Sequence, residues 1–192
     1  MARKYEFQPD KPYSSWLNKL QLTKQQQRQA LKWFLYALLL IVLSVLQDVV
    51  LCRMRFYGGT TDLVPCGIFI ICILEGSHKG SVFALVASYL YALSGTAPGP
   101  QVMVLITAIA VFVTIFRQAY LHLSFPSVLL CTCLAMVLYE LSVFAFCLFL
   151  GSTTPDRFIS FAVPVTLSVI IIPILYPLTK AIAATGGETW KE

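Results

Sequence analysis

Glu75 and His78 are the closest approach to an acid–base pair in this sequence, because side chains three residues apart meet on one turn of a helix. They stand in the polar stretch EGSHKGS, so we expect Glu75, His78 and Lys79 to lie in a solvated loop. His122 has no cysteine, serine or carboxylate arranged around it. Catalysis requires a nucleophile with a base, a carboxylate pair or a metal cluster. The sequence shows none of these patterns and therefore favours a protein that is not an enzyme.

Two acids within or beside apolar segments could act without catalysis. Asp48 stands near the end of the first apolar run, where water can reach it, and is a candidate site at the outer end of that helix. Glu140 stands between Tyr139 and Leu141, deep in a long apolar run. An ionisable side chain at such a depth is a functional candidate by default. A neutral carboxyl that hydrogen-bonds a neighbouring helix is an equally good interpretation of Glu140.

The six cysteines lie in or beside apolar runs without a CxxC spacing, and no histidine or carboxylate accompanies them as a zinc ligand would. We interpret them as small apolar side chains. No phosphate-binding glycine loop is present, so the sequence predicts neither a metal nor a cofactor. The cysteines are Cys52, Cys66, Cys72, Cys131, Cys133 and Cys147.

The elements that would position these residues are membrane helices. The chain has 192 residues, of which 58% are hydrophobic and only 12% charged, and its mean hydropathy is +0.77. Soluble domains carry about twice that share of charged residues, so this composition indicates an all-α integral membrane protein. Most of the net charge of +5 stands in the first 32 residues. Such a cluster suits an anionic lipid surface, and nothing else suggests nucleic acid.

Six apolar segments predict six transmembrane helices between two tails. Residues 1–30 form a basic cytoplasmic tail, either mobile or helical on the membrane surface; residues 31–180 form the membrane domain; and 181–192 form a second cytoplasmic tail. The second and third helices are short enough for a re-entrant hairpin, but we prefer two short spanning helices because a hairpin would bury the charges of Glu75 and Lys79. The predicted helices are Lys32–Leu51, Thr61–Leu74, Gly80–Leu93, Gln101–Phe116, Pro126–Leu150 and Phe158–Leu178.

Loop charges set the expected orientation. With both termini in the cytoplasm, eleven Lys and Arg residues lie inside and three lie outside. This excess follows the positive-inside rule. We therefore expect a multi-pass membrane protein with both termini in the cytoplasm.

A row of small residues follows the third predicted helix at intervals of four. Residues four apart share one face of a helix, and small side chains let membrane helices approach closely. The row therefore predicts a face for packing on another helix or on a partner. Its members are Gly76, Gly80, Ala84, Ser88 and Ala92.

Five short segments in this order resemble MreD, a small membrane protein of the bacterial cell-elongation (rod) complex. They are LQD at 46–48, TDLV at 61–64, LEG at 74–76 with Gly80, LSGTAPG at 93–99 and PILYPL at 173–178. The chain differs from the family in having Tyr91 and Ala92 where an aspartate often precedes the Ser-Gly pair, and in its longer basic tail.

The resemblance implies a six-helix fold similar to the substrate-binding subunits of energy-coupling-factor vitamin transporters. It also implies a non-catalytic scaffold that binds MreC and the glycan polymerase and transpeptidase, supporting side-wall peptidoglycan synthesis and cell shape. The alternative is a true vitamin-transporter subunit, which needs an outward pocket of polar and aromatic groups. Such a subunit would usually carry two alanines four apart in the first helix, whereas Ala30 and Ala37 are seven apart.

Overall fold

The computed structural model describes residues 24–49, 61–95 and 97–186. The regular structure in these ranges is entirely helical, and its six long helices confirm the predicted all-α fold. Predictions that fall on residues 1–23, 50–60, 96 and 187–192, including most of both tails and Cys52, lie outside the described residues. The helices are α2 (Lys24–Val49), α3 (Leu63–Glu75), α4 (Ser77–Leu93), α5 (Val102–Tyr120), α6 (Phe125–Phe149) and α7 (Phe158–Thr185), the last preceded by the 3-10 turn η2 (Pro155–Arg157).

The first and last helices extend beyond their predicted limits. Helix α2 begins at Lys24, inside the predicted tail, because its glutamines and Ala30 favour a helix and no breaker intervenes. Helix α7 continues through the alanine-rich stretch 181–184 to Thr185. It also passes through Pro164, Pro173 and Pro177, each of which removes one backbone hydrogen bond from the helix. A membrane helix tolerates prolines where neighbouring groups satisfy the freed carbonyls.

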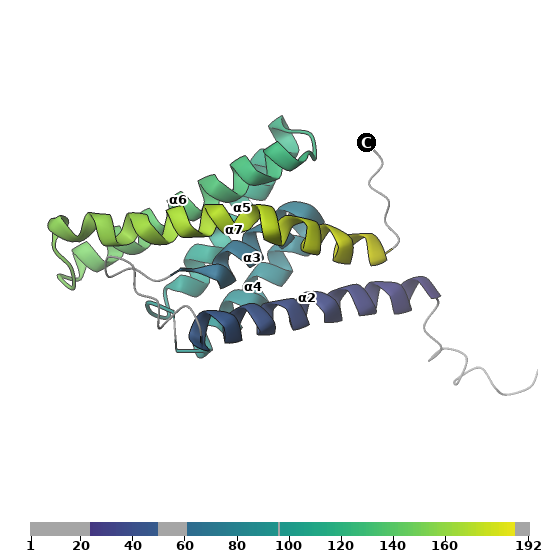
Figure 1. Cartoon of the computed structure of the whole chain (residues 1–192), viewed down its shortest axis with the longest axis horizontal. Helices are drawn as coiled ribbons and strands as arrows, with labels where there is room; N and C mark the ends of the chain where they lie inside the picture. The colour runs from purple at the N-terminus through teal and green to yellow at the C-terminus, as the bar shows by residue number, and fades with distance from the viewer. Residues whose placement is uncertain (1–23, 50–60, 96, 187–192) are drawn as a thin grey trace, which may run out of the picture.

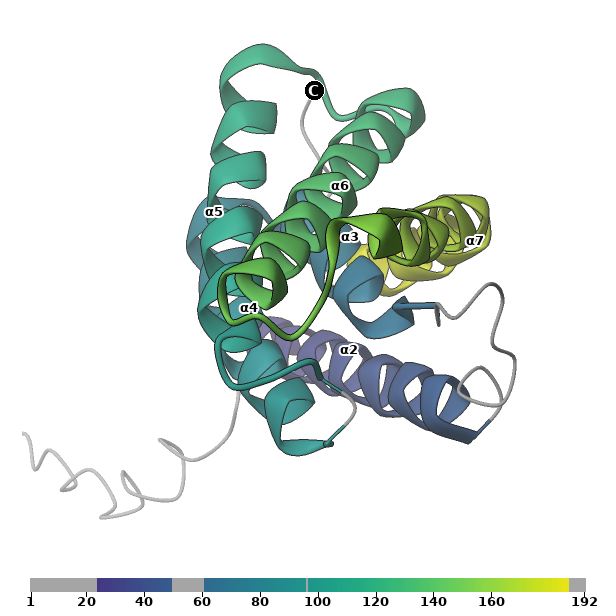
Figure 2. The ribbon, with the colours of Figure 1, turned by 90° about the vertical axis from the view of Figure 1, so that its left-hand side faces the viewer.

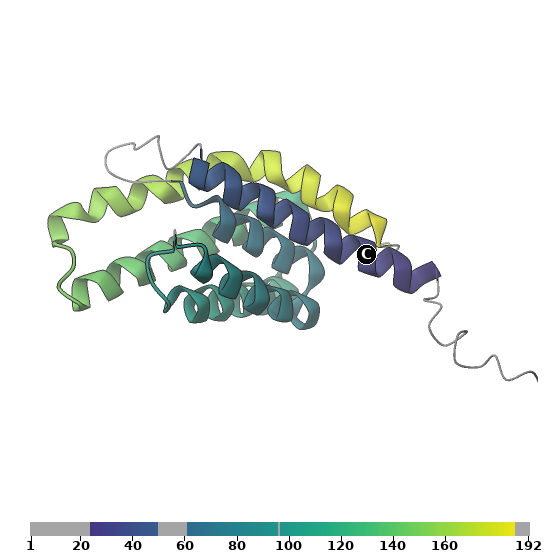
Figure 3. The ribbon, with the colours of Figure 1, turned by 90° about the horizontal axis from the view of Figure 1, so that it is seen from below.

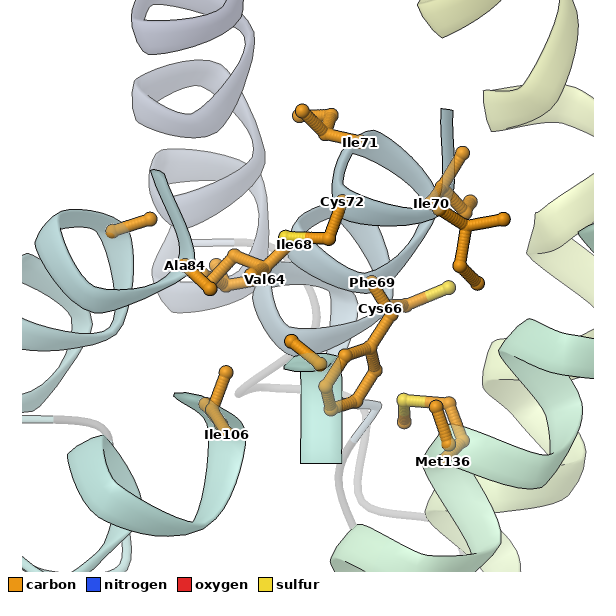
Figure 4. Packing of buried hydrophobic residues seen from close by; sticks show 14 of the residues in the cluster. Val64, Cys66, Ile68, Phe69, Ile70, Ile71, Cys72, Ala84, Ile106 and Met136 are labelled. Carbon is orange, nitrogen blue, oxygen red and sulfur yellow. The ribbon is translucent and has the colours of Figure 1, made fainter. Parts of the chain in front are cut away.

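Helix α3 is the centre of the bundle. It contacts each of the other five long helices, and Figure 2 shows it surrounded by them. All its residues are buried except Glu75, which is partly exposed as a whole residue although its side chain is buried. Figure 4 shows its side chains meeting Ala84 of α4, Ile106 of α5 and Met136 of α6. An all-round apolar sequence suits a helix with a neighbour on every side.

Four of the six long helices are long and apolar enough to cross a membrane: α2, α5, α6 and α7. Helix α3 is apolar but has only 13 residues, which span about 20 Å. Helix α4 has 17 residues. Of this short pair, only α3 is enclosed by the other helices; α4 lies at the side of the bundle, where most of its large apolar side chains are exposed.

The start of α2 and the end of α7 lie at the same end of the bundle (Figures 1 and 3). A side-chain carbon built on Gly186 would lie 2.5 Å from a carbon of Lys32, so the two segments are direct neighbours. We call this the terminal end. The opposite end, where α2 finishes and α3 begins, we call the distal end.

Candidate functional site: polar clusters at the two ends of the central helix

The small-residue row lies mainly against other helices of the same chain. Gly80, Ala84 and Ser88 are buried, whereas Ala92 is only partly buried. A Cβ on Gly80 would lie 2.9 Å from the backbone oxygen of Cys72, so α4 and α3 touch backbone to backbone there. The Ser88 hydroxyl lies 3.3 Å from the carbonyl oxygen of Met103 in α5. The row thus packs α4 on α3 and α5.

Gly76, the first member of the row, is a turn residue between α3 and α4. Its φ of 88° lies in the region that glycine adopts without steric cost. The turn reverses the chain between two helices separated by this one residue. Gly76 therefore serves the connection rather than the packing face.

Glu75 at the terminal end is not in a solvated loop, and that prediction was wrong. Its Oε2 lies 2.7 Å from Lys32 Nζ, and the two side chains are only 1% and 5% exposed. The Tyr36 hydroxyl donates a hydrogen bond of 2.7 Å to Glu75 Oε1. Lys32 likewise belongs to this buried cluster and not to a free basic tail. His78 and Lys79, by contrast, are exposed as expected.

Arg117 also acts at the terminal end of α3. Its Nη2 donates a 2.7 Å hydrogen bond to the carbonyl oxygen of Ile73, in the last turn of that helix. The last carbonyls of a helix lack partners inside it and carry a partial negative charge. Arg117 therefore anchors α5 to the end of α3.

Gln47 holds the distal end of the same helix. Its Oε1 accepts a hydrogen bond of 3.0 Å from the Val64 backbone N–H, and its Nε2 lies 3.4 Å from the Tyr91 hydroxyl. The first N–H groups of a helix have no partner within it. One amide side chain therefore joins α2, α3 and α4.

Asp62 and Glu140 form a carboxyl pair beside Gln47. Asp62 stands at the N-cap position of α3 but makes no capping hydrogen bond. Its side chain instead hydrogen-bonds that of Glu140 in α6. Such a bond requires a proton on one of the two carboxyl groups. Glu140 is 5% exposed, and its Oε1 is buried without a hydrogen-bond partner in the described part of the chain.

Further polar groups converge on this pair. The Tyr91 and Tyr139 side chains lie near both acids, and the Ser168 hydroxyl of α7 donates to the Asp62 carbonyl oxygen at 3.4 Å. The distal cluster, which we define as Gln47, Asp62, Tyr91, Tyr139, Glu140 and Ser168, thus draws on α2, α4, α6 and α7 around the start of α3.

The remaining candidates stand apart. Asp48 is exposed at the end of α2 and lines a groove between α2 and α4. Cys66, Cys72 and Cys131 are buried free thiols, and Cys133 and Cys147 are partly buried. Among the residues described, no three His, Cys, Asp or Glu side chains are grouped as a metal site requires.

Sequence reasoning identified Glu140 as an intramembrane acid but did not pair it with Asp62. It missed Lys32, Tyr36 and Arg117 as buried polar residues. The sequence indicates the burial of these three residues only through their place in or beside an apolar run, where a solvated side chain has little room. Comparison with protein-family models, curated proteins and solved structures finds no match to this chain.

Proposed function

We propose that this protein is a non-catalytic membrane scaffold of the bacterial cell-elongation complex, which binds MreC and supports side-wall peptidoglycan synthesis. Two kinds of observation support the proposal: the structural use of the MreD-like segments, and a groove on the side of the bundle. The bundle would lie in the cytoplasmic membrane with both termini inside.

The MreD-like segments sit where the central helix is fixed. Gln47 of LQD binds the backbone of Val64 in TDLV, and Glu75 of LEG pairs with Lys32. Gly80, which follows LEG, allows the close crossing of α4 over α3. Residues that carry the resemblance therefore shape a rigid core, as a scaffold requires.

The observation that carries the proposal is the groove between α2 and α4. It has two adjoining parts, of about 390 and 500 Å³, which share Ala37, Phe83 and Val86. The small side chains Ser44 and Ala87 also line it. Small residues allow a second helix to approach closely in a membrane, where packing rather than the hydrophobic effect drives association.

The ends of this groove are polar. Asp48 lines its distal part, and His78 and Lys79 line its terminal part. An apolar middle between polar ends matches the pattern of a single transmembrane helix. A partner anchored by one such helix, as we propose for MreC, fits this surface.

Filling the groove tests the proposal. Ala37 is exposed on α2, so Ala37→Leu adds bulk to the groove without disturbing the core. We expect it to abolish co-purification with MreC and to round cells that depend on the protein for rod shape. Ala181→Leu, an exposed alanine on α7, is the matched control and should be silent. Failure of the unaltered protein to co-purify with MreC would refute the proposal.

The alternative function, a vitamin-transporter substrate subunit, is favoured by the distal cluster, since convergent polar and aromatic groups are what a substrate pocket needs. Several of these groups, however, already bind one another or the start of α3. Calorimetric titration of the purified protein with water-soluble vitamins distinguishes the two functions. Saturable vitamin binding that is lost in Asp62→Asn would establish the transporter function.

A further inference from the structure

A second groove, between α6 and α7, leads to the acid pair. It has a volume of about 250 Å³ and is apolar except for Glu140 and Thr166. Its other lining residues include Val137, Leu141 and Phe144 of α6 and Ala162 of α7. Glu140 is thus a buried acid with an unpartnered Oε1 in the described structure, placed in the wall of an open groove.

The depth of Glu140 limits what can reach it. It lies nine residues before the end of α6 at Phe149, which is about 14 Å along a helix. The hydrocarbon core of a bilayer is about 30 Å thick, so Glu140 lies about half that thickness from the end of α6. Lipid headgroups lie at the membrane surface, and an apolar groove does not solvate a small cation. A group carried on a membrane-spanning segment is therefore the occupant that fits this groove.

The charge of the acid pair indicates the chemistry of that group. A proton shared between Asp62 and Glu140 leaves one negative charge on two carboxyl groups. The described basic side chains near the bundle core are committed elsewhere: Lys32 pairs with Glu75, and Arg117 binds the Ile73 carbonyl. Both lie at the terminal end, away from the start of α3. The acid pair therefore has no partner in either of these two buried basic side chains.

We infer that Glu140 is an intramembrane docking acid: at Glu140, the negative charge that it shares with Asp62 receives a basic side chain from the transmembrane helix of a partner protein lying against the groove between α6 and α7. A basic side chain in the bilayer is costly unless it meets an acid. The pairing would make this groove selective for helices with a lysine, arginine or histidine at the level of Glu140. Wholly apolar helices would gain nothing from Glu140.

The inference rests on the proposed scaffold function only in requiring a partner helix. It assigns a second surface, separate from the groove between α2 and α4. Loss of one surface should leave binding at the other intact.

Photo-crosslinking in native membranes tests the inference. A benzoylphenylalanine probe replaces Thr166, an exposed groove residue, and a control probe replaces Val104, which is exposed on α5. From position 166 we expect a crosslink to the transmembrane helix of another protein, within one turn of a basic residue. Glu140→Gln should lower the crosslink yield roughly tenfold or more, as loss of one member of a buried charge pair does. Glu140→Asp, which keeps the charge, should retain part of it.

A second variant covers the case in which Glu140→Gln fails to accumulate. Ala162→Phe fills the groove from an exposed position and leaves Glu140 unchanged, so it should lower the yield to a similar degree. Crosslinks only to lipid, to a second copy or to a helix without a basic residue would overturn the inference, as would an unchanged yield in either variant.

The two proposals fail separately in these measurements. Co-purification of MreC with a negative result at position 166 would refute the docking acid and leave the scaffold standing. The predicted crosslink without MreC binding would refute the rod-complex scaffold and leave the docking acid standing.

Discussion

Lys32 Nζ and Glu75 Oε2 lie 2.7 Å apart inside the protein, where they join α2 to the turn between α3 and α4. Tyr36 donates to the other oxygen of the same carboxylate. An exposed ion pair of this kind contributes little to stability. A buried pair behaves differently, because removing one partner leaves the other charge in a medium that cannot solvate it.

Glu75→Gln should therefore destabilise the protein strongly, by about 3–5 kcal/mol, since Lys32 keeps its charge and loses its partner. The double variant Lys32→Met/Glu75→Gln should recover most of that loss, because no buried charge remains and the glutamine oxygen still accepts from Tyr36. Thermal unfolding in detergent measures both. Arg28→Gln removes an exposed charge from the same helix and is the control. A double variant less stable than Glu75→Gln would contradict the argument.

Two glycine-to-alanine changes should have opposite or clearly different effects on the free energy of unfolding. In an open helix the change stabilises by up to about 1 kcal/mol. At Gly80 the new carbon would lie 2.9 Å from the Cys72 backbone oxygen, so Gly80→Ala should separate α4 from α3 and cost about 1–3 kcal/mol. At Gly67 the nearest atom is the end of the flexible Leu43 side chain, so Gly67→Ala should be neutral or mildly stabilising. Equal unfolding temperatures would show that the backbones do not need to touch.

Gln47 should stabilise the protein through the hydrogen bond that it accepts from the Val64 N–H group. Gln47→Met keeps the length of the side chain but leaves that buried donor unpaired, at a cost of about 1–3 kcal/mol. Asp48→Asn, at the exposed neighbouring position, should change stability by less than about 0.5 kcal/mol. Chemical denaturation of the two variants in parallel provides the measurement. A neutral Gln47→Met would mean that water replaces the amide.

The sequence was sufficient to predict six helices, because apolar runs separated by polar turns report burial directly. It was also sufficient for the packing face of α4, since Gly80, Ala84 and Ser88 recur at the helical period and small size is itself the signal. Both inferences depend on neighbours in sequence.

The polar clusters are formed by side chains from helices that are far apart in the sequence. No pattern within one segment predicts such contacts. Glu75 stands in a polar stretch that predicted a solvated loop, yet its side chain is buried against Lys32 of another helix. Asp62 has the residue type of a helix cap, but its side chain turns to Glu140 across the bundle. Only the way α3 is enclosed by the longer helices brings these groups together.

The orientation of the bundle follows from charge and is tested by reporter fusions. A reporter after Glu192 should be cytoplasmic, and one inserted at Gly58–Gly59 should be external, because eleven of fourteen basic residues then lie inside. Alkaline phosphatase, which is active only outside the cytoplasm, reports the second site; a fluorescent protein reports the first. With this orientation the distal end faces the outside of the cell. A cytoplasmic signal from the 58–59 site would place the distal end on the cytoplasmic side instead.

The acid pair should be visible in the infrared spectrum of the purified protein. Because a hydrogen bond between the Asp62 and Glu140 carboxyl groups requires a proton, we expect a carbonyl-stretch band of a protonated carboxyl group at neutral pH. Asp62→Asn and Glu140→Gln should each shift or remove the band, since each changes the hydrogen-bond partner, and the double variant should abolish it. Asp156→Asn, an exposed acid in η2, should leave it unchanged. A band that survives in the double variant would place the proton on another side chain, and no band in the unaltered protein would mean that the two acids are not hydrogen-bonded.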